Sequence, residues 1–128
     1  MMAAETLFEK CLYPSCCHPA YYSCLQLMKY TIQEKMGIPY HQQDIEINRI
    51  DKRVARSGSH NYLIDKIVYR MKELDKDEAR LFKRSIEDLK ASREDSDYKD
   101  IPISRDYSEK SINTAKIINS QLIKIFKI

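Results

Sequence analysis

Apolar residues recur at helical spacing in several stretches of this chain, and the clearest stretch runs from Pro19 to about Met36. Proline fits the first turn of a helix, where its missing N–H costs nothing. Gly37 stands in the position of a C-terminal cap and Pro39 prevents continuation, so we expect the helix to end there. One stripe at intervals of three and four positions defines its buried face: Tyr21, Leu25, Met28, Ile32 and Met36.

Two further stripes predict consecutive helices. The first opens at Ser59, ends near Asp75 and carries Leu63, Ile64, Ile67, Val68, Met71 and Leu74. The run from Asp75 to Glu78 has the form of a capping box, in which two side chains each bond the other residue's backbone N–H. The helix that it opens should reach about Arg93 and carries Leu81, Phe82, Ile86 and Leu89.

The ends and the middle of the chain give weaker patterns. Residues 3–12 predict a short helix, and a last helix begins at Tyr107 or Ser108. The face of that last helix is Ile112, Ala115, Asn119, Leu122 and Phe126, with Ile118 and Ile125 beside it. Residues 40–58 are mostly polar and locally basic, so they form either a helix over 43–55 or a partly ordered connection.

These elements predict an all-α fold: an antiparallel up-and-down bundle of four to five helices, one domain over residues 1–128 with a core from about 5 to 126. The composition supports this, because 2 Gly and 4 Pro in 128 residues are too few for the turns of an all-β fold. The glycine loops that cradle phosphates are also missing. A nucleotide would therefore have to be held by side chains, and a net charge of +3 does not by itself indicate nucleic acid.

Location and metal binding follow from equally simple features. No apolar run approaches about 18 residues and residues 1–10 lack a secretory pattern, so we expect a cytoplasmic protein with no membrane contact. Adjacent cysteines strain a single tetrahedral zinc site. We therefore expect no metal and no cofactor, and small buried thiols with one or two exposed ones among Cys11, Cys16, Cys17 and Cys24.

Three local features are candidates for chemistry. Tyr21 and Tyr22 are adjacent in a helix, and we expect one to pack in the core and the other to lie at the surface. His60 lies at a helix start as a cap or surface residue, where the helix dipole should lower its pKa. Arg93 lies near a helix end, where it either pairs with Asp97 or binds a phosphate beside Tyr98.

Taken in order, these segments resemble the HEPN family of small helical bundles. The segment Ala20–Tyr30 is similar to the family's tyrosine-pair helix, and Gly58–Ile64 is similar to its second conserved helix start. The segment Leu89–Tyr98 resembles its L…R…DY stretch, and the closing helix with Ala115 resembles its terminal helix. The resemblance spans about residues 5–126.

The resemblance implies an up-and-down bundle, a homodimer and, in many members, an RNase toxin paired with a small nucleotidyltransferase antitoxin. The RNase branch has a His four to six residues after the Arg that corresponds to Arg93, but here Tyr98 holds that place. Tyrosine titrates near pH 10 and is a poor proton shuttle at neutral pH. Catalysis would therefore depend on Arg93, Tyr98 and His60, and only if the fold brings His60 to Arg93.

Three hypotheses follow for the function. The first is a HEPN-like module, leaning non-enzymatic, that binds a nucleotide, RNA or a nucleotidyltransferase partner as a dimer. Its ligand-binding residues would be Arg93, Asp97, Tyr98, Tyr22 and His60. The second is a metal-independent RNase toxin. The third is a purely structural interaction module whose apolar stripes pack onto a partner.

Overall fold

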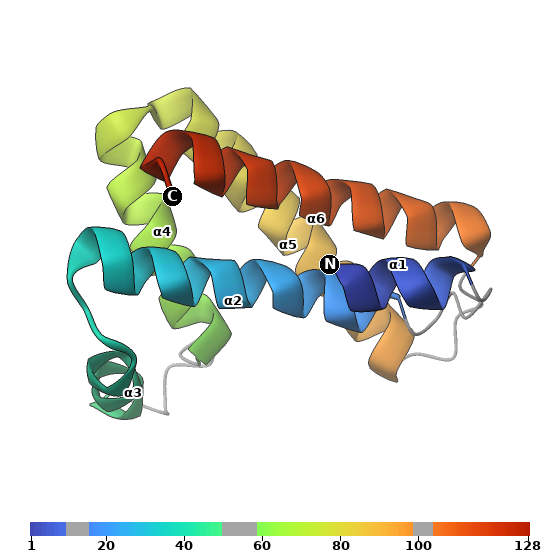
Figure 1. Cartoon of the computed structure of the whole chain (residues 1–128), viewed down its shortest axis with the longest axis horizontal. Coiled ribbons are helices and arrows are strands. Elements are labelled where there is room, and N and C mark those ends of the chain that lie inside the picture. Colours follow the sequence, from blue (N-terminus) through green and yellow to red (C-terminus); the bar gives the residue numbers. More distant parts are fainter. Residues whose placement is uncertain (10–15, 50–58, 99–103) are drawn as a thin grey trace.

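The computed structural model confirms the all-α bundle (Figure 1). It describes residues 1–9, 16–49, 59–98 and 104–128, with the side chains of all but 7, 8, 49, 59 and 95–98. Within these ranges there is no strand, and the helices are α1 (Met2–Glu9), α2 (Cys17–Met36), α3 (Tyr40–Arg49), α4 (Ser59–Leu74), α5 (Lys76–Tyr98) and α6 (Arg105–Phe126). No helix in the described part of the chain combines the length and apolarity needed to span a membrane.

Helices α2, α5 and α6 form the centre of the bundle (Figure 1). The first and last of these run in the same direction, because Cys17 Sγ and Ser111 Oγ lie 3.5 Å apart near their N-terminal ends. Helix α5 runs the opposite way, since Gln121 late in α6 bonds to Glu78 early in α5. Helix α4 crosses the bundle near the C-terminal ends of α2 and α6, and α1 packs on the N-terminal side of the same two helices.

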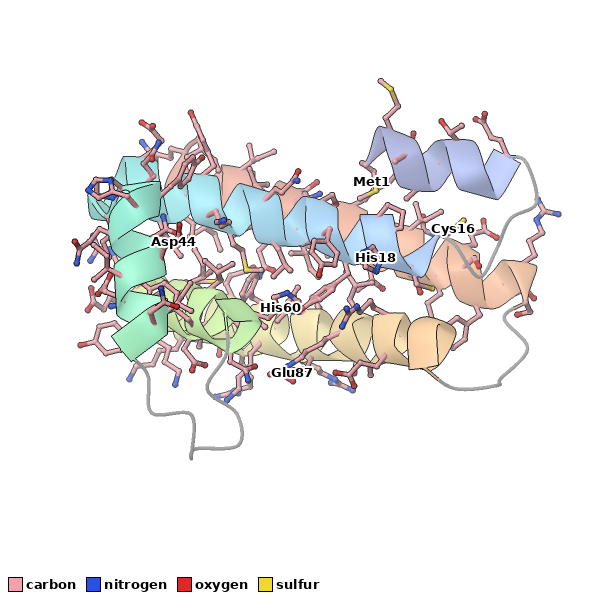
Figure 2. The ribbon with its side chains drawn as sticks, turned by 90° about the horizontal axis from the view of Figure 1, so that it is seen from below. Met1, Cys16, His18, Asp44, His60 and Glu87 are labelled. Atoms are coloured by element: carbon pink, nitrogen blue, oxygen red, sulfur yellow. The ribbon has the colours of Figure 1, made fainter. Side chains whose placement is uncertain are left out.

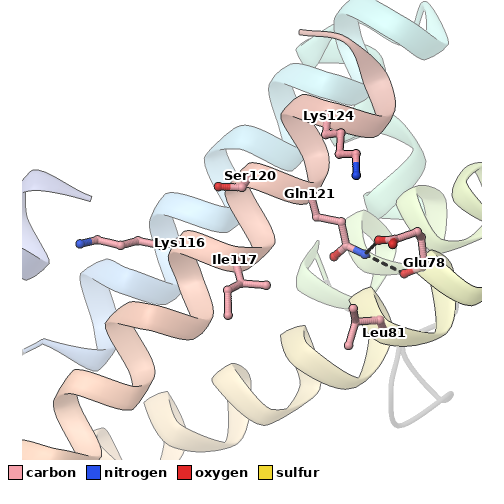
Figure 3. A pocket seen from close by; sticks show the side chains of 7 residues that line it. All are labelled: Glu78, Leu81, Lys116, Ile117, Ser120, Gln121 and Lys124. Carbon is pink, nitrogen blue, oxygen red and sulfur yellow. Dashed lines mark hydrogen bonds between the residues drawn. The ribbon is translucent and has the colours of Figure 1, made fainter.

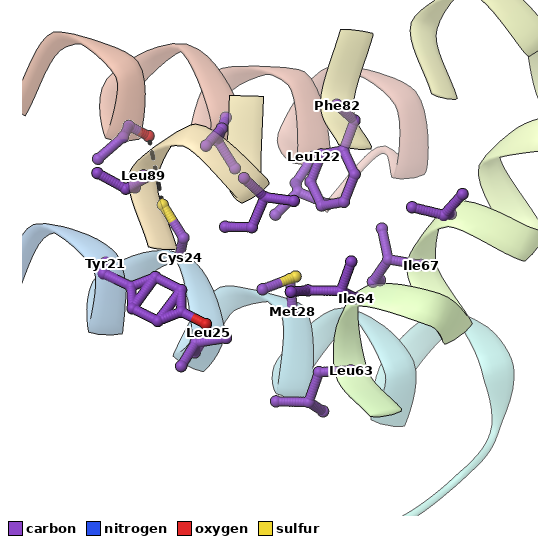
Figure 4. Packing of buried hydrophobic residues seen from close by; sticks show 14 of the residues in the cluster. Tyr21, Cys24, Leu25, Met28, Leu63, Ile64, Ile67, Phe82, Leu89 and Leu122 are labelled. Atoms are coloured by element: carbon purple, nitrogen blue, oxygen red, sulfur yellow. Dashed lines mark hydrogen bonds between the residues drawn. The ribbon is translucent and has the colours of Figure 1, made fainter. Parts of the chain in front are cut away.

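The apolar stripes predicted from the sequence form one continuous core between these helices (Figure 4). Full burial of each large apolar side chain stabilises the fold by roughly 1.5–3 kcal/mol. Two members of the predicted stripes do not take part, because Leu74 and Leu81 are 51% and 48% exposed. The largest fully buried side chains include Tyr21, Phe82, Met28 and Ile32.

The C-terminal end of α2 is as predicted, whereas its beginning differs by two residues. Gly37 adopts the left-handed conformation at φ 68°, and its N–H donates to the carbonyl of Ile32. A residue with a β-carbon is disfavoured at this φ, so glycine completes the cap. The helix begins at Cys17 and not at Pro19, which lies in the first turn, where a proline is still tolerated.

The capping box predicted at the start of α5 is only half correct. Asp75 Oδ1 accepts hydrogen bonds from the backbone N–H groups of Asp77 and Glu78, at 3.0 and 3.2 Å. The Glu78 carboxylate does not return the bond to Asp75, because it accepts from Gln121 Nε2 at 2.7 Å instead. A partner 43 residues away in the sequence has replaced the local one.

Residues 40–49 form a helix, the first of the two alternatives, but it starts earlier than residue 43, and the predicted continuation to 55 lies outside the described residues. A fully buried glutamine fixes its position: Gln43 Nε2 donates to the carbonyls of Ile38 and Lys29 at 2.9 and 3.2 Å. The helix is also tied to α4, because Tyr62 Oη donates to Glu46 Oε2 at 2.7 Å.

The other predicted helix ends shift by a few residues. Helix α1 begins at Met2, one residue before the predicted start, and the predicted residues 10–12 lie outside the described residues. Helix α5 continues to Tyr98, so Arg93 lies inside it and not at its end. Helix α6 begins at Arg105, because Ser104 caps it by accepting from the Tyr107 N–H at 3.1 Å.

Candidate functional site

A group of aromatic and basic side chains lies where α2, the first turn of α4 and the second half of α5 meet. We call it the cationic-aromatic cluster, and Figure 2 shows His18 and His60 on the side where α2 and α5 face each other. Its members are His18, Tyr21 and Tyr22 of α2, His60 of α4, and Lys90 and Arg93 of α5.

Tyr21 anchors the cluster in the core. Its side chain is fully buried, and its hydroxyl lies 3.2 Å from His60 Nδ1. The two rings meet edge to face, with centroids 5.4 Å apart. Burial raises the pKa of Tyr21 well above its ordinary value, so the phenol stays protonated. A neutral, rigid phenol therefore fixes the orientation of the His60 ring and leaves Nε2 as the nitrogen available to a ligand.

Tyr22 is half-buried and contacts three other members of the cluster besides Tyr21, whose ring meets it edge-on at 5.8 Å. His18 stacks on it with centroids 4.4 Å apart and 20° between the planes. His60 meets it edge-on at 5.6 Å, and the Arg93 guanidinium carbon lies 5.9 Å from the ring centroid. His18 is the exposed ring of this stack. The prediction that one tyrosine packs in the core and its neighbour lies nearer the surface is confirmed.

Two cations from α5 complete the cluster. Lys90 and Arg93 are one helical turn apart, so they share a face of the helix. Lys90 Nζ donates to Asn61 Oδ1 of α4 at 3.0 Å, which holds the ammonium beside the first turn of that helix. The carboxylates of Glu87 and Glu94 on the same helix are exposed.

The pKa of His60 is lowered, chiefly by burial and then by the positive charges of Arg93, Lys90 and His18. The direction matches the sequence prediction, which attributed it to the helix dipole. The larger cause is partial removal from water, and the neighbouring cations come from helices far away in the sequence. His60 is therefore a neutral imidazole near pH 7, able to accept or donate one hydrogen bond at Nε2.

The structure brings together three of the predicted site residues: Tyr22, His60 and Arg93. The side chains of the other two, Asp97 and Tyr98, lie outside the described residues.

The sequence reasoning did not assign His18, Tyr21 and Lys90 to the site. Two of them carried a local signal, because His18 lies four positions before Tyr22 and Lys90 three before Arg93. Tyr21 carried none, since its role depends on a contact with a residue 39 positions away.

The cysteines lie apart from this cluster. Cys16, Cys17 and Cys24 are buried free thiols, as predicted for the buried members, and Cys11 lies outside the described residues. Burial raises the pKa of Cys24 to about 12. In the described ranges no three His, Cys, Asp or Glu side chains are placed to share a metal ion.

The cluster combines a fixed guanidinium, an ammonium, a neutral imidazole and an exposed aromatic ring. Guanidinium and ammonium groups bind phosphate, and aromatic rings stack on bases. Comparisons with protein-family models, with curated proteins and with solved structures found no match to this chain. The geometry of this cluster is therefore the basis on which a function is proposed.

Proposed function

We propose that this chain is a HEPN-like helical module that binds RNA or a nucleotide through the cationic-aromatic cluster, without itself carrying out chemistry. The observation that supports this best is the position of the Arg93 guanidinium over the Tyr22 ring, with His60 edge-on to the same ring. Because the Tyr22 ring is itself held by contacts with His18 and His60, the guanidinium is held in place before a ligand arrives.

A phosphate group would be held by side chains from two helices. Arg93 offers a planar fork of N–H donors, Lys90 a second positive charge, and His60 an Nε2 directed by its bond to Tyr21. The low Gly content requires this kind of site, since the chain has no glycine loop to supply backbone N–H groups.

A base would stack on His18. The Tyr22 ring already contacts both His18 and Arg93, and His18 is the more exposed ring. A stacked base would extend the pair that these two rings already form. The proposal therefore assigns stacking to His18 and makes Tyr22 its support.

The test is binding of a fluorescein-labelled single-stranded RNA, followed by fluorescence anisotropy, with AMP titrated in parallel. Arg93→Ala should weaken binding of both at least about tenfold, because a charge-assisted contact to phosphate is lost. The matched control is Arg84→Ala: this exposed arginine lies 9 positions earlier, about 2.5 turns, and so faces the opposite way on α5. It should change binding less than about twofold. Equal binding by the parent and Arg93→Ala would show that the cluster is not the site.

A second candidate, a metal-independent RNase, is favoured by one specific observation: the fold brings a neutral His60 into the same cluster as Arg93. The imidazole would take the proton of a ribose 2′-hydroxyl, whose oxygen attacks the adjacent phosphorus, and the 5′-oxygen would leave with a proton from water. Arg93 would stabilise the charge on the phosphate oxygens. The product would end in a 2′,3′-cyclic phosphate.

This candidate is tested with purified protein and labelled RNA in the presence of EDTA. Cleavage that is lost in both His60→Gln and Arg93→Ala would establish the RNase. Binding without cleavage would support the non-enzymatic module instead. The homodimer and the nucleotidyltransferase partner that the resemblance implies are tested by light scattering of the purified protein and by co-purification with the product of a neighbouring gene.

A further inference from the structure

On the other side of α5 from the cationic-aromatic cluster, an apolar groove lies between α5 and α6. Its volume is about 330 Å³, within the range of small-ligand sites, roughly 300–1,000 Å³. Leu81 and Ile117 form its walls, and they are 48% and 56% exposed. Figure 3 shows the two side chains on either side of the space between the helices. Two large apolar side chains thus face solvent in a place where they could both cover a guest.

One polar atom in the groove lacks a partner within the described residues. Gln121 Nε2 donates to both the carbonyl and the carboxylate of Glu78, at 2.8 and 2.7 Å. Because both of those atoms are acceptors, the amide can only point its nitrogen toward Glu78. Its oxygen, Oε1, is thereby turned to the side of Ile117 and Leu81 (Figure 3), where it is buried without a hydrogen bond.

An unmet buried acceptor costs free energy, and a guest that brings a donor would recover it. The oxygen is covered by its neighbours in the unoccupied groove, and the half-exposed side chains of Leu81 and Ile117 can rotate to uncover it. The guest must therefore present a single N–H or O–H at the edge of an apolar surface. Tryptophan and tyrosine are the side chains with that combination.

The charged side chains at the rim of the groove indicate which charge a guest should carry. Lys116 and Lys124 line it from α6, and Lys124 is exposed. The one carboxylate in the lining, that of Glu78, is already bonded to Gln121. Lys116 is paired with Glu5 of α1 at 3.1 Å, so Lys124 is the cation of the rim that can attract a carboxylate beside the aromatic side chain.

We propose that this groove is a docking site for a partner protein segment that carries an aromatic N–H or O–H side chain beside an acidic residue. The aromatic ring fills the space between Leu81 and Ile117, its donor bonds to Gln121 Oε1, and the neighbouring carboxylate faces Lys124. The site is independent of the cationic-aromatic cluster, because the two lie on different sides of α5.

The chain offers a direct readout, because it contains no Trp. The fluorescence of a peptide with one tryptophan between glutamates, such as EEWLEE, therefore reports only on the peptide. We expect saturable binding with a blue-shifted emission. The same peptide with 1-methyltryptophan, which lacks the N–H, should bind at least about fivefold more weakly. A peptide with lysines in place of the glutamates should not bind measurably.

Two matched variants test the place of binding. Ile117→Glu should weaken binding of the acidic peptide at least about tenfold, because it puts a charge into the apolar wall. Ile123→Glu is the control, since it adds the same charge to a similarly exposed position of α6 outside the groove. Unfolding midpoints near that of the parent would show that both variants fold. RNA binding should be unchanged in both, which separates failure here from failure of the proposed function.

Three outcomes would overturn the proposal. One is equal binding by Ile117→Glu and Ile123→Glu, and another is equal binding of the tryptophan and 1-methyltryptophan peptides. The third is a dimer of the free protein that Ile117→Glu alone dissociates, since the occupant would then be a second copy of this chain.

Discussion

The side chains on the two sides of α5 differ in how firmly other helices hold them. Toward α2 and α4, Arg93 and Lys90 meet aromatic rings and an amide from other helices, and their positions are fixed by contacts. Toward α6, Leu81 stays half exposed, and the buried acceptor Gln121 Oε1 lacks a bond within the described residues. Charged groups and exposed apolar side chains therefore lie on separate sides of this helix. Each side has one buried polar side chain at its centre, Tyr21 toward α2 and Gln121 toward α6.

The core between these two sides should dominate stability. Leu81 and Phe82 are neighbours in the sequence, but Phe82 is fully buried and Leu81 is 48% exposed. Phe82→Ala should lower the free energy of unfolding by about 3–5 kcal/mol, because it removes transfer energy and leaves a cavity. Leu81→Ala should lower it by less than about 1 kcal/mol. Urea denaturation followed by circular dichroism measures both, and similar losses would contradict the division between core and groove.

Substitution of Tyr21, which anchors the cationic-aromatic cluster in the core, should have the next largest effect on the free energy of unfolding. Tyr21→Phe keeps the buried ring but removes the hydroxyl bonded to His60, and should cost about 0.5–1.5 kcal/mol. Tyr69→Phe, at a position that is 72% exposed, is the control and should cost almost nothing. The same denaturation experiment applies. A neutral Tyr21→Phe would mean that the His60 ring is held by packing alone.

Protonation of His60 should make the free energy of unfolding depend on pH. Its pKa in the folded chain lies below the ordinary value of 6.5, so between these two values the unfolded chain binds more protons. Stability is therefore highest above about pH 6.5 and falls as the pH falls from there toward the folded pKa. His60→Gln should flatten this decline. Unfolding curves across that pH window test it, and an unchanged slope in the variant would assign the decline to other groups.

Substitution of Lys116 at the rim of the groove should have the smallest effect on the free energy of unfolding. Lys116 pairs with Glu5 of α1 at 3.1 Å, and both side chains are about half exposed. Water screens such pairs, so Lys116→Ala should change the free energy of unfolding by less than about 0.5 kcal/mol. A larger loss would show that α1 depends on this contact, which could be checked with Glu5→Gln.

The local parts of the fold could be read from the sequence. Helical periodicity placed the stripes of α2, α4, α5 and α6, and Gly37 marked a helix end correctly. These signals depend on neighbours within one or two turns, so they survive without knowledge of the packing. Periodicity wrongly predicted that Leu74 and Leu81 are buried. An apolar stripe does not indicate how much of its length a neighbouring helix covers.

The sequence by itself therefore determined that the chain is an all-α bundle, and named Arg93, Tyr22 and His60 as residues of interest. Only the tertiary structure decided that these three meet, that Tyr21 orients His60, and that Glu78 bonds to Gln121 rather than capping its own helix. The reason is physical: helix formation depends on residues a few positions apart. The environment that sets a pKa or leaves an acceptor unmet is assembled from helices brought together by packing.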